Sequence, residues 1–364
     1  MDTFGNEQIE AAEVVFPCES LAENLAFFTE TLGFCLEIVY PADAPRVAVV
    51  SGYGVRIRLE EKPGEAPALL RLLGRGADIA PGLAAELVAP NGTRVEFEAT
   101  DTPPFIPDLR PSLSVQKAGY QSNWVIGRAG MQYRDLIPDR WGGAYIASHI
   151  RIPEGGPVAD YVHHHHIIFQ LIYCYKGWVR VVYEDQGPEF VMQAGDCVLQ
   201  PPHIRHRVLE CSDEFEVIEI GCPAEHATLV DHELSLPTEQ RHPRRSFNGQ
   251  GFCFHQAAGA DWSTWRCDGF ESRDTGIARA TDNIVSVSVV RSTSASSSSR
   301  SSHAGELLFK FVLQGSMTLE CGENERWHLV AGDAFTIPAG IDYCLSDCSD
   351  DLEFLEVLTP SSSQ

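Results

Sequence analysis

Residues 163–177 read HHHHIIFQLIYCYKG, and residues 195–206 read GDCVLQPPHIRH. The first stretch fits the pattern His163-x-His165-x4-Gln170, and the second ends on His206. In a β-strand, residues two apart lie on the same face, so His163 and His165 are predicted to point together into a β-barrel. A strand on the opposite side would bring His206 to the same place. Three imidazoles and the Gln170 side-chain oxygen then predict a site for one divalent ion, with positions left open for a substrate.

The two stretches together resemble the paired signatures of the cupin superfamily, G-x5-H-x-H-x3,4-E-x6-G and G-x5-P-x-G-x2-H-x3-N. The resemblance implies a jelly-roll barrel with one transition metal on the four residues just named, with Fe(II) favoured and Mn, Ni or Zn as alternatives. The sequence has Gln170 where the signature has Glu, His203 where it has Gly, and Glu210 where it has Asn. A neutral Gln170 leaves more of the ion's charge uncompensated, which favours Lewis-acid polarisation or an anionic substrate.

The register of the histidine run is open. His164 and His166, with three residues before Gln170, satisfy the same loose pattern. We favour His163 and His165, because a spacing of four residues is common in the family that the motifs resemble. In that register His164 faces away from the cavity. His203 falls in a turn, where exposure to solvent is the default expectation.

A second copy of the pattern follows the first. Turn residues recur at offsets of 138, 137 and 137 positions, Gly177 as Gly315, Gly195 as Gly332 and Pro201 as Pro338, and Arg134-Asp135 has a counterpart in Arg273-Asp274. Two successive units rich in short strands and glycine turns predict two tandem antiparallel barrels, so the resemblance is to a bicupin. In the second copy Leu308 stands where the acid is expected, and Tyr343 stands at the later histidine position. We therefore expect the second barrel to be metal-free, with His303 and Glu306 as a weaker alternative site.

Residues 10–100 have a mixed α and β pattern. A helical pattern over 21–32 lies among strand patterns at 13–16, 35–40, 46–50 and 55–60. This β-α-β-β-β order, with Phe27-Phe28 and Leu32-Gly33-Phe34, resembles one module of the glyoxalase/bleomycin-resistance (vicinal oxygen chelate) superfamily. That resemblance implies metal ligands on paired modules, but the segment has no histidine and one clear module, so we expect a non-catalytic role.

The chain is expected to contain three domains. Prolines break up residues 101–117, which predicts a linker. We expect a small α+β domain with this linker over 1–117, a metal-binding barrel over 118–235, and a degenerate barrel over 236–364. The predicted fold class is therefore mainly β.

Composition and charge exclude several classes of protein. With 27 Lys+Arg against 51 Asp+Glu, the 364-residue chain carries a formal charge of −24, which argues against nucleic acid and anionic membranes as partners. No apolar run approaches the roughly 18 residues of a membrane span, and the N-terminus lacks the pattern of a signal peptide. The 11 cysteines include no Cys-x-x-Cys pair and are interpreted as mostly buried thiols. We therefore expect a cytoplasmic protein.

These observations favour a metal-dependent enzyme with a small-molecule substrate. Within that class we expect a dioxygenase-type oxidoreductase acting on a small oxygenated substrate, because three neutral imidazoles suit Fe(II). An isomerase or lyase would need a general base, and the nearest candidates by sequence are Tyr161, Tyr173 and Glu210. A non-catalytic sensor that binds a small molecule is the alternative from another class, and the degenerate second barrel favours it. A homodimer is left open, because cupins often dimerise through edge strands.

Overall fold

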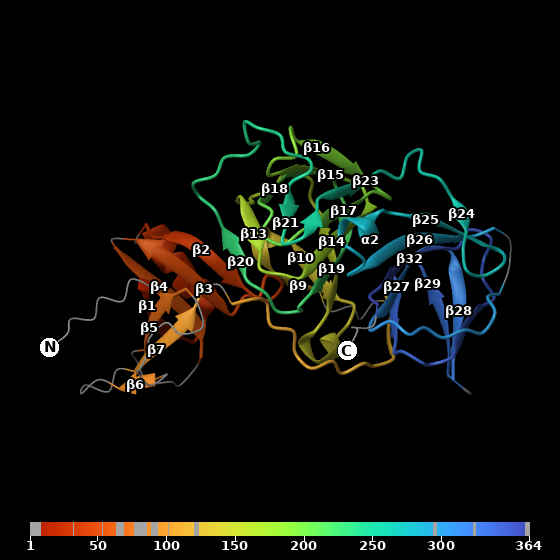
Figure 1. The fold of residues 1–364 in the computed structure, drawn as a ribbon, viewed down its shortest axis with the longest axis horizontal. Helices are drawn as coiled ribbons and strands as arrows, with labels where there is room; N and C mark the ends of the chain where they lie inside the picture. Colours follow the sequence, from red (N-terminus) through yellow and green to blue (C-terminus); the bar gives the residue numbers. More distant parts are fainter. Residues whose placement is uncertain are drawn as a thin grey trace. The chain divides into compact units, whose positions relative to one another are not determined.

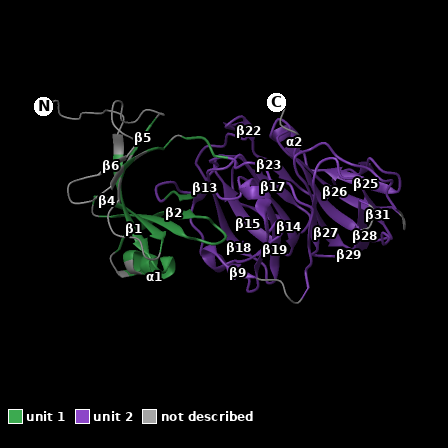
Figure 2. Cartoon of the chain, turned by 90° about the horizontal axis from the view of Figure 1, so that it is seen from below, with its two compact units in different colours: residues 1–105, 226–231 green, residues 106–225, 232–364 purple. Residues whose placement is uncertain are grey.

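The computed structural model describes residues 9–31, 33–52, 54–62, 69–75, 86–88, 94–100, 102–119, 124–293, 297–322 and 325–360. This part of the chain is mainly β and divides into two compact units (Figure 1, Figure 2). Unit 1 comprises residues 1–105 and 226–231, and unit 2 comprises residues 106–225 and 232–364. Within the ranges given above, no helix is both long enough and apolar enough to cross a membrane.

Unit 1 is a single sheet with one short helix. The strands lie in the order β20-β2-β3-β4-β1-β5-β7-β6. Their bounds are β1 (Ile9–Cys18), β2 (Cys35–Tyr40), β3 (Val47–Gly52), β4 (Val55–Glu61), β5 (Leu69–Gly74), β6 (Glu86–Val88), β7 (Arg94–Ala99) and β20 (Thr228–Val230). The helix α1 (Leu21–Ala26) continues as a π turn over Phe27–Thr31.

The core of unit 1 follows from the alternation of its strands. Ala48 and Val50 on β3, and Ile57 and Leu59 on β4, are each two residues apart, so they share a face. They form one buried cluster with Leu21 of α1. The order of helix and strands predicted over residues 10–60 is therefore observed, and its resemblance to a glyoxalase module stays a prediction.

Barrel 1, in unit 2, is built from two sheets. One has the order β17-β14-β19-β11-β10-β9, and the other has the order β16-β15-β18-β13, with β12 also on β18. Their bounds are β9 (Val125–Ile126), β10 (Gln132–Asp135), β11 (Ile146–Ile152), β12 (Gly156–Pro157), β13 (His163–His165), β14 (Phe169–Lys176), β15 (Trp178–Tyr183), β16 (Phe190–Gln193), β17 (Cys197–Gln200), β18 (His206–Cys211) and β19 (Phe215–Cys222). Side chains from both sheets meet in one core, to which Val181 of β15 and Val217 of β19 belong.

Barrel 2 repeats this arrangement. Its sheets have the orders β24-β25-β26-β32-β27-β30 and β29-β28-β31. Their bounds are β24 (Ser263–Thr264), β25 (Phe270–Asp274), β26 (Ser286–Ser292), β27 (Leu308–Gln314), β28 (Ser316–Cys321), β29 (Glu325–Val330), β30 (Ala334–Ile337), β31 (Tyr343–Ser346) and β32 (Glu353–Leu358). Gly177 and Gly315 close equivalent hairpins, β14–β15 and β27–β28, and both have a φ of 72°. Since this left-handed φ favours glycine, the recurrence detected in the sequence marks a structural repeat.

Shorter elements join these strands. They are the 3₁₀ turns Arg128–Gly130 and Arg140–Gly143, the two-stranded sheet of β21 (Ser246–Phe247) and β22 (Gln250–Gly251), and the helix α2 (Ile277–Ala280). All 11 cysteines are free thiols and most are buried, which agrees with the interpretation of the sequence.

The two barrels exchange short strands. β8 (Ser114–Gln116), which precedes barrel 1, pairs with β30 of barrel 2, and β23 (Cys253–His255), which precedes barrel 2, pairs with β17 of barrel 1. Each added strand satisfies backbone groups on a sheet edge that would otherwise need water. Residues 101–117 are therefore more than a linker. The domain boundaries at 117/118 and 235/236 stay predictions, and β8, β20 and β23 each pair across them.

Two arginines and a common core hold the barrels together. Arg134 of barrel 1 donates a hydrogen bond to the Gly332 carbonyl at 2.6 Å, and Arg273 of barrel 2 donates one to the Gly195 carbonyl at 3.3 Å. A continuous buried cluster contains Tyr173 of barrel 1 together with residues of barrel 2 such as Phe309 and Phe311. The barrels therefore pack as one body, and the interior core of each barrel is a separate buried cluster.

Candidate metal centre

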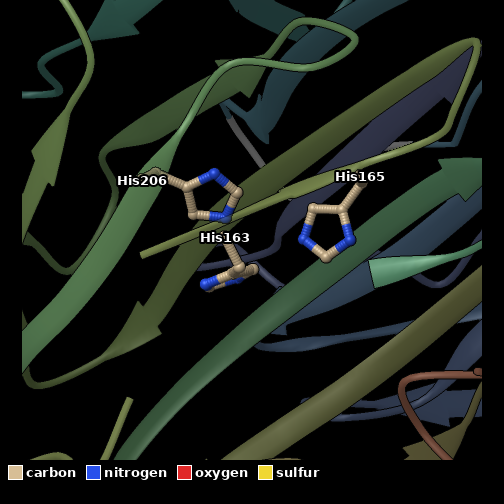
Figure 3. Close-up of side chains that lie close together, drawn as sticks. All are labelled: His163, His165 and His206. Atoms are coloured by element: carbon tan, nitrogen blue, oxygen red, sulfur yellow. The ribbon is translucent and has the colours of Figure 1, made fainter. Parts of the chain in front are cut away.

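Three histidines of barrel 1 converge inside the barrel. His163 and His165 lie on the same face of β13, and His206, the first residue of β18, pairs in register with His163. Figure 3 shows the three side chains directed toward one another. Their ligand atoms lie within 4.8 Å of one another, and all three residues are buried. The strand alternation predicted from the sequence is therefore what brings these imidazoles together.

Backbone carbonyls orient two of the three rings. Nδ1 of His163 lies 2.8 Å from the Tyr161 carbonyl oxygen, and Nδ1 of His206 lies 3.0 Å from the Ile204 carbonyl oxygen. A carbonyl can only accept, so Nδ1 carries the hydrogen in each ring and Nε2 keeps its lone pair. Nε2 of His163 is buried and has no hydrogen-bond partner in the described part of the chain. Such outer hydrogen bonds are the usual support of metal-binding histidines, so these residues fit a bound metal ion.

The protonation of these rings also suits a metal. Burial lowers the pKa of His163 well below its usual range, and it lowers the pKa of His206 to about 4. Both imidazoles are therefore neutral at pH 7, and a metal can bind without displacing a proton.

Asp160 forms a second layer behind His163. Its carboxylate pairs with Arg128, accepts the Val208 backbone N–H at 2.9 Å, and lies 3.6 Å from Nδ1 of His163. Burial raises the pKa of Asp160, whereas its interactions with His163 and Arg128 lower it, and the resulting pKa is about 2. Asp160 is therefore an ionised carboxylate, and its contacts hold the side chains of Arg128 and His163 in place.

The alternative register of the histidine run lies on the other face of β13. His164 and His166 are half-buried, and both contact His203, with ring centroids 5.4 Å apart in each pair. His203, expected to be exposed in its turn, is also half-buried. The structure thus separates the run into an inner pair, His163 and His165, and an outer pair.

Gln170, the predicted fourth ligand, lies on β14 in register with Gln200. Its side chain is 1% exposed, and Oε1 is buried without a hydrogen-bond partner in the described residues. Gln200 lines the cavity described next, whereas Gln170 is not among the residues that line it. Its role as a ligand stays a prediction.

A cavity with about 70 Å³ of open space lies inside barrel 1, which is room for a few water-sized groups. The three histidines, Arg128 and Glu219 line it, together with a wall that is mostly apolar. Gln200 donates a hydrogen bond to the Tyr183 hydroxyl at 2.9 Å, and the Tyr183 ring stacks on His206. The cavity therefore combines one polar end with hydrophobic sides, as small-molecule sites usually do.

None of the three sequence candidates for a general base lines this cavity within the described ranges. Tyr161 is 49% exposed, because its backbone carbonyl, rather than its ring, meets His163. Tyr173 faces the core shared by the barrels, since it alternates with Ile172, which lines the cavity. Glu210, on β18, accepts a hydrogen bond of 2.5 Å from the guanidinium of Arg180.

Sequence reasoning missed Glu219. Phe215, Val217 and Glu219 alternate on β19 and all line the cavity, so a carboxylate occupies an inward position in an apolar run. The alternation of these three residues is visible in the sequence, but the sequence alone does not say which face of β19 points into the barrel.

Barrel 2 has a charged cluster in the corresponding place. Lys310 on β27 and Glu356 on β32 are paired in register, as Ile172 and Glu219 are in barrel 1. Lys310 is 0% exposed, its Nζ lies 2.8 Å from Glu356, and Arg266 donates two hydrogen bonds of 2.6 Å to the same carboxylate. The buried ammonium of Lys310, with the partly exposed guanidinium of Arg266 beside it, repels a metal cation. The metal-free second barrel stays a prediction, and this cluster gives it a physical reason.

The structure contains two tandem β-barrels, and three buried histidines lie together inside the first of them. A family model described as a cupin domain matches residues 148–220, which run from β11 to β19 of barrel 1. A search of curated proteins found none that is significantly similar to this sequence.

Several solved structures share the double-barrel fold. A deletion mutant of Bacillus subtilis oxalate decarboxylase OxdC is similar with a TM-score of 0.52 and 11% identity, over 69% of this chain and 78% of that one. Protein Ylba from E. coli has a TM-score of 0.51 and 11% identity, over 71% and 95% of the two chains. The formate complex of Lactobacillus farciminis oxalate decarboxylase has a TM-score of 0.50 and 13% identity, over 71% and 89%. At these identities the similarity shows the fold alone.

Proposed function

We propose that the protein is a metal-dependent enzyme that acts on a small molecule in the cavity of barrel 1. The observation that supports this most is the set of three buried histidines at the polar end of that cavity, two of them oriented by backbone carbonyls. Buried imidazoles without compensation would cost stability, so a barrel with a purely structural role would not favour them. A bound divalent ion would supply a Lewis acid or a redox centre here.

The cavity limits the substrate by size and charge. Its open space is about 70 Å³, and most of its wall is apolar. Arg128 and Asp160 neutralise one another, and burial keeps the His163 and His206 rings neutral by lowering their pKa values. Among the described residues that line the cavity, Glu219 is the one carboxylate that opposes the charge of a bound ion. A small neutral or monoanionic molecule with an apolar substituent fits this balance better than a dianion does.

Within the enzyme class we favour a dioxygenase. An all-imidazole ligand set suits Fe(II), and an apolar cavity suits O₂. Both oxygen atoms of O₂ would enter the substrate, so the reaction needs no external reductant. The chain's own contribution is to hold the rings, to exclude water with the apolar wall and to accept a substrate proton on the carboxylate of Glu219.

A lyase or isomerase is the second candidate, and Glu219 is the observation that favours it. This residue gives the cavity a carboxylate that could move a proton without any change in redox state. Two of the structural neighbours named above are oxalate decarboxylases, which adds carbon–carbon bond cleavage to the reactions worth testing.

The decisive experiment is elemental analysis of untagged protein purified without chelator, followed by a substrate panel. Stoichiometric iron, with O₂ uptake on adding a catechol, a diketone or a thiol, would support the dioxygenase. Metal-dependent turnover of a hydroxy, keto or dicarboxylic acid without O₂ uptake would support the lyase or isomerase. Protein that binds no metal, with a ligand affinity that His163→Ala leaves unchanged, would contradict the enzyme proposal.

We expect Glu219→Gln to lower kcat about 100-fold while the metal content stays at the wild-type level. The amide keeps the size of the side chain and cannot accept the substrate proton. Steady-state kinetics and metal analysis on the same preparation measure both quantities. Glu210→Gln is the matched control, because Glu210 pairs with Arg180 outside the cavity and should leave kcat unchanged. A wild-type kcat in Glu219→Gln would remove Glu219 from the mechanism.

A further inference from the structure

The outer histidines of β13 meet a residue in a strained turn. His203 has a φ of 65°, a left-handed conformation that residues with a Cβ rarely adopt. Its turn is closed by a hydrogen bond of 3.2 Å from the Ile204 N–H to the Pro201 carbonyl, with Pro202 in the second position. A turn of this pattern favours glycine or asparagine in the third position.

The same turn in barrel 2 shows what the fold prefers there. Pro338 and Ile341 are joined by the equivalent hydrogen bond of 3.4 Å, and the third position is Gly340, with a φ of 74°. Barrel 1 therefore carries an imidazole where its own repeat carries a glycine. Strain of this kind is usually tolerated where the side chain has a function.

The imidazole of His203 is placed against the other two outer rings. Nδ1 of His203 lies 3.4 Å from Nδ1 of His164, and the ring centroid of His166 lies 5.4 Å from that of His203. Two nitrogens bound to one tetrahedral zinc ion at about 2.05 Å are themselves about 3.4 Å apart. The backbone N–H of His203 also donates to the His165 carbonyl at 3.2 Å, which fixes the turn against β13.

We propose that His164 and His203 hold a second metal ion, on the face of β13 opposite the inner histidines, and that His166 completes the site by turning its ring toward them. The nitrogens of the three rings do not all lie within 4.8 Å of one another before that turn. Its donors are imidazole nitrogens alone, so the ions it would take are Zn²⁺, Cu²⁺ and Ni²⁺ rather than Mg²⁺ or Ca²⁺. The nearby guanidinium of Arg205 lies 3.8 Å from the Glu184 carboxylate, which Arg245 binds at 2.6 Å, so the repulsion of a cation by Arg205 is offset only in part. This site stands independently of the reaction proposed for the cavity.

The test is Zn²⁺ titration of the untagged, metal-stripped full-length protein by calorimetry, in four forms. We expect two equivalents of Zn²⁺ for the wild type, one for His203→Gly, one for His206→Ala and none for the double variant. His242→Ala is the control, since His242 is an exposed histidine whose ring pairs with Gln240 and should leave two equivalents.

Thermal melting separates loss of a ligand from loss of the fold. His203→Gly adopts the turn of barrel 2, so its melting temperature without metal should not fall, while the rise caused by the second equivalent of Zn²⁺ should disappear. His203→Asn, which also tolerates a left-handed φ, should behave in the same way. A His203→Gly variant that binds as many equivalents of Zn²⁺ as the wild type would overturn the proposal and leave a hydrogen bond between the rings as the reason for their approach. A wild type that binds a single equivalent, which His203→Gly abolishes, would support this site and contradict the inner one.

Discussion

Replacing His206 with alanine is expected to remove the metal from barrel 1 and, with it, any turnover. Loss of a supporting outer-layer group alone typically lowers metal affinity 10–100-fold, so loss of one of three imidazole ligands should lower it by at least about 100-fold. The wild-type ring is neutral and oriented by the Ile204 carbonyl, so alanine removes a ligand that is already in place. Metal content after gel filtration, together with the affinity for Fe²⁺ or Mn²⁺, measures the effect.

His164→Ala is the matched control for the inner site. His164 neighbours both inner ligands in sequence but points to the other face of β13, so the bound iron or manganese should stay in place. If His164→Ala lost that metal and His206→Ala kept it, the register assigned to the run would be wrong.

The second large effect is expected in barrel 2, where Glu356→Gln should lower the free energy of unfolding by about 3–5 kcal/mol. The amide would leave the buried ammonium of Lys310 and the guanidinium of Arg266 without their shared counter-charge. Lys310→Met, in contrast, should cost little, because Arg266 still pairs with Glu356 through two hydrogen bonds and the methionine meets the rings of Trp265 and Phe354. Urea unfolding of both variants, followed by fluorescence, measures the difference. Equal losses in the two variants would contradict a cluster centred on Glu356.

The same cluster predicts how stability depends on pH. Burial raises the pKa of Glu356, but Lys310 and Arg266 lower it, and the result is about 2, against a reference value of 4.5. A carboxyl group with a lowered pKa stabilises the folded state above the unfolded pKa, and this contribution is lost as the pH falls. We therefore expect the wild type to lose on the order of 3 kcal/mol between pH 4.5 and pH 2 from this group. Glu356→Gln should show a flatter profile over that interval in denaturation experiments.

Much of the fold could be predicted because tight turns and the alternation of apolar residues in strands each have a local sequence pattern. Gly177 and Gly315 are needed for their left-handed φ, so the repeat was visible without any structure. The strands β1 to β4 of unit 1 alternate apolar residues over short runs, and the predicted ranges lie within a few residues of them. The strand exchange could not be predicted, because β8 and β23 are three residues each and are defined by the distant edges they join.

The site was predictable in part, for a related reason. The spacing of residues along single strands can be read from the sequence, and it predicts the inner ligands His163, His165 and His206. Whether Glu219 and Lys310 point into their barrels depends on which face of the strand is buried, and the packing of the opposite sheet decides this. His203 was expected to be exposed because a turn residue usually is, and its contact with His164 depends on how the turn folds back on β13.

The exchange of β8 and β23 has a consequence for the history of the chain. Two identical barrels that trade arms make a symmetric dimer, and joining the two copies in one polypeptide makes that partnership permanent. Once the two copies are joined, either barrel can lose its own chemistry and still be retained. Without it, the remaining barrel would have an uncovered sheet edge. A barrel with a salt bridge in its interior, like that of Lys310 and Glu356, is then a scaffold that its neighbour needs. Cutting the chain between the barrels should therefore yield fragments that associate with one another in preference to standing alone.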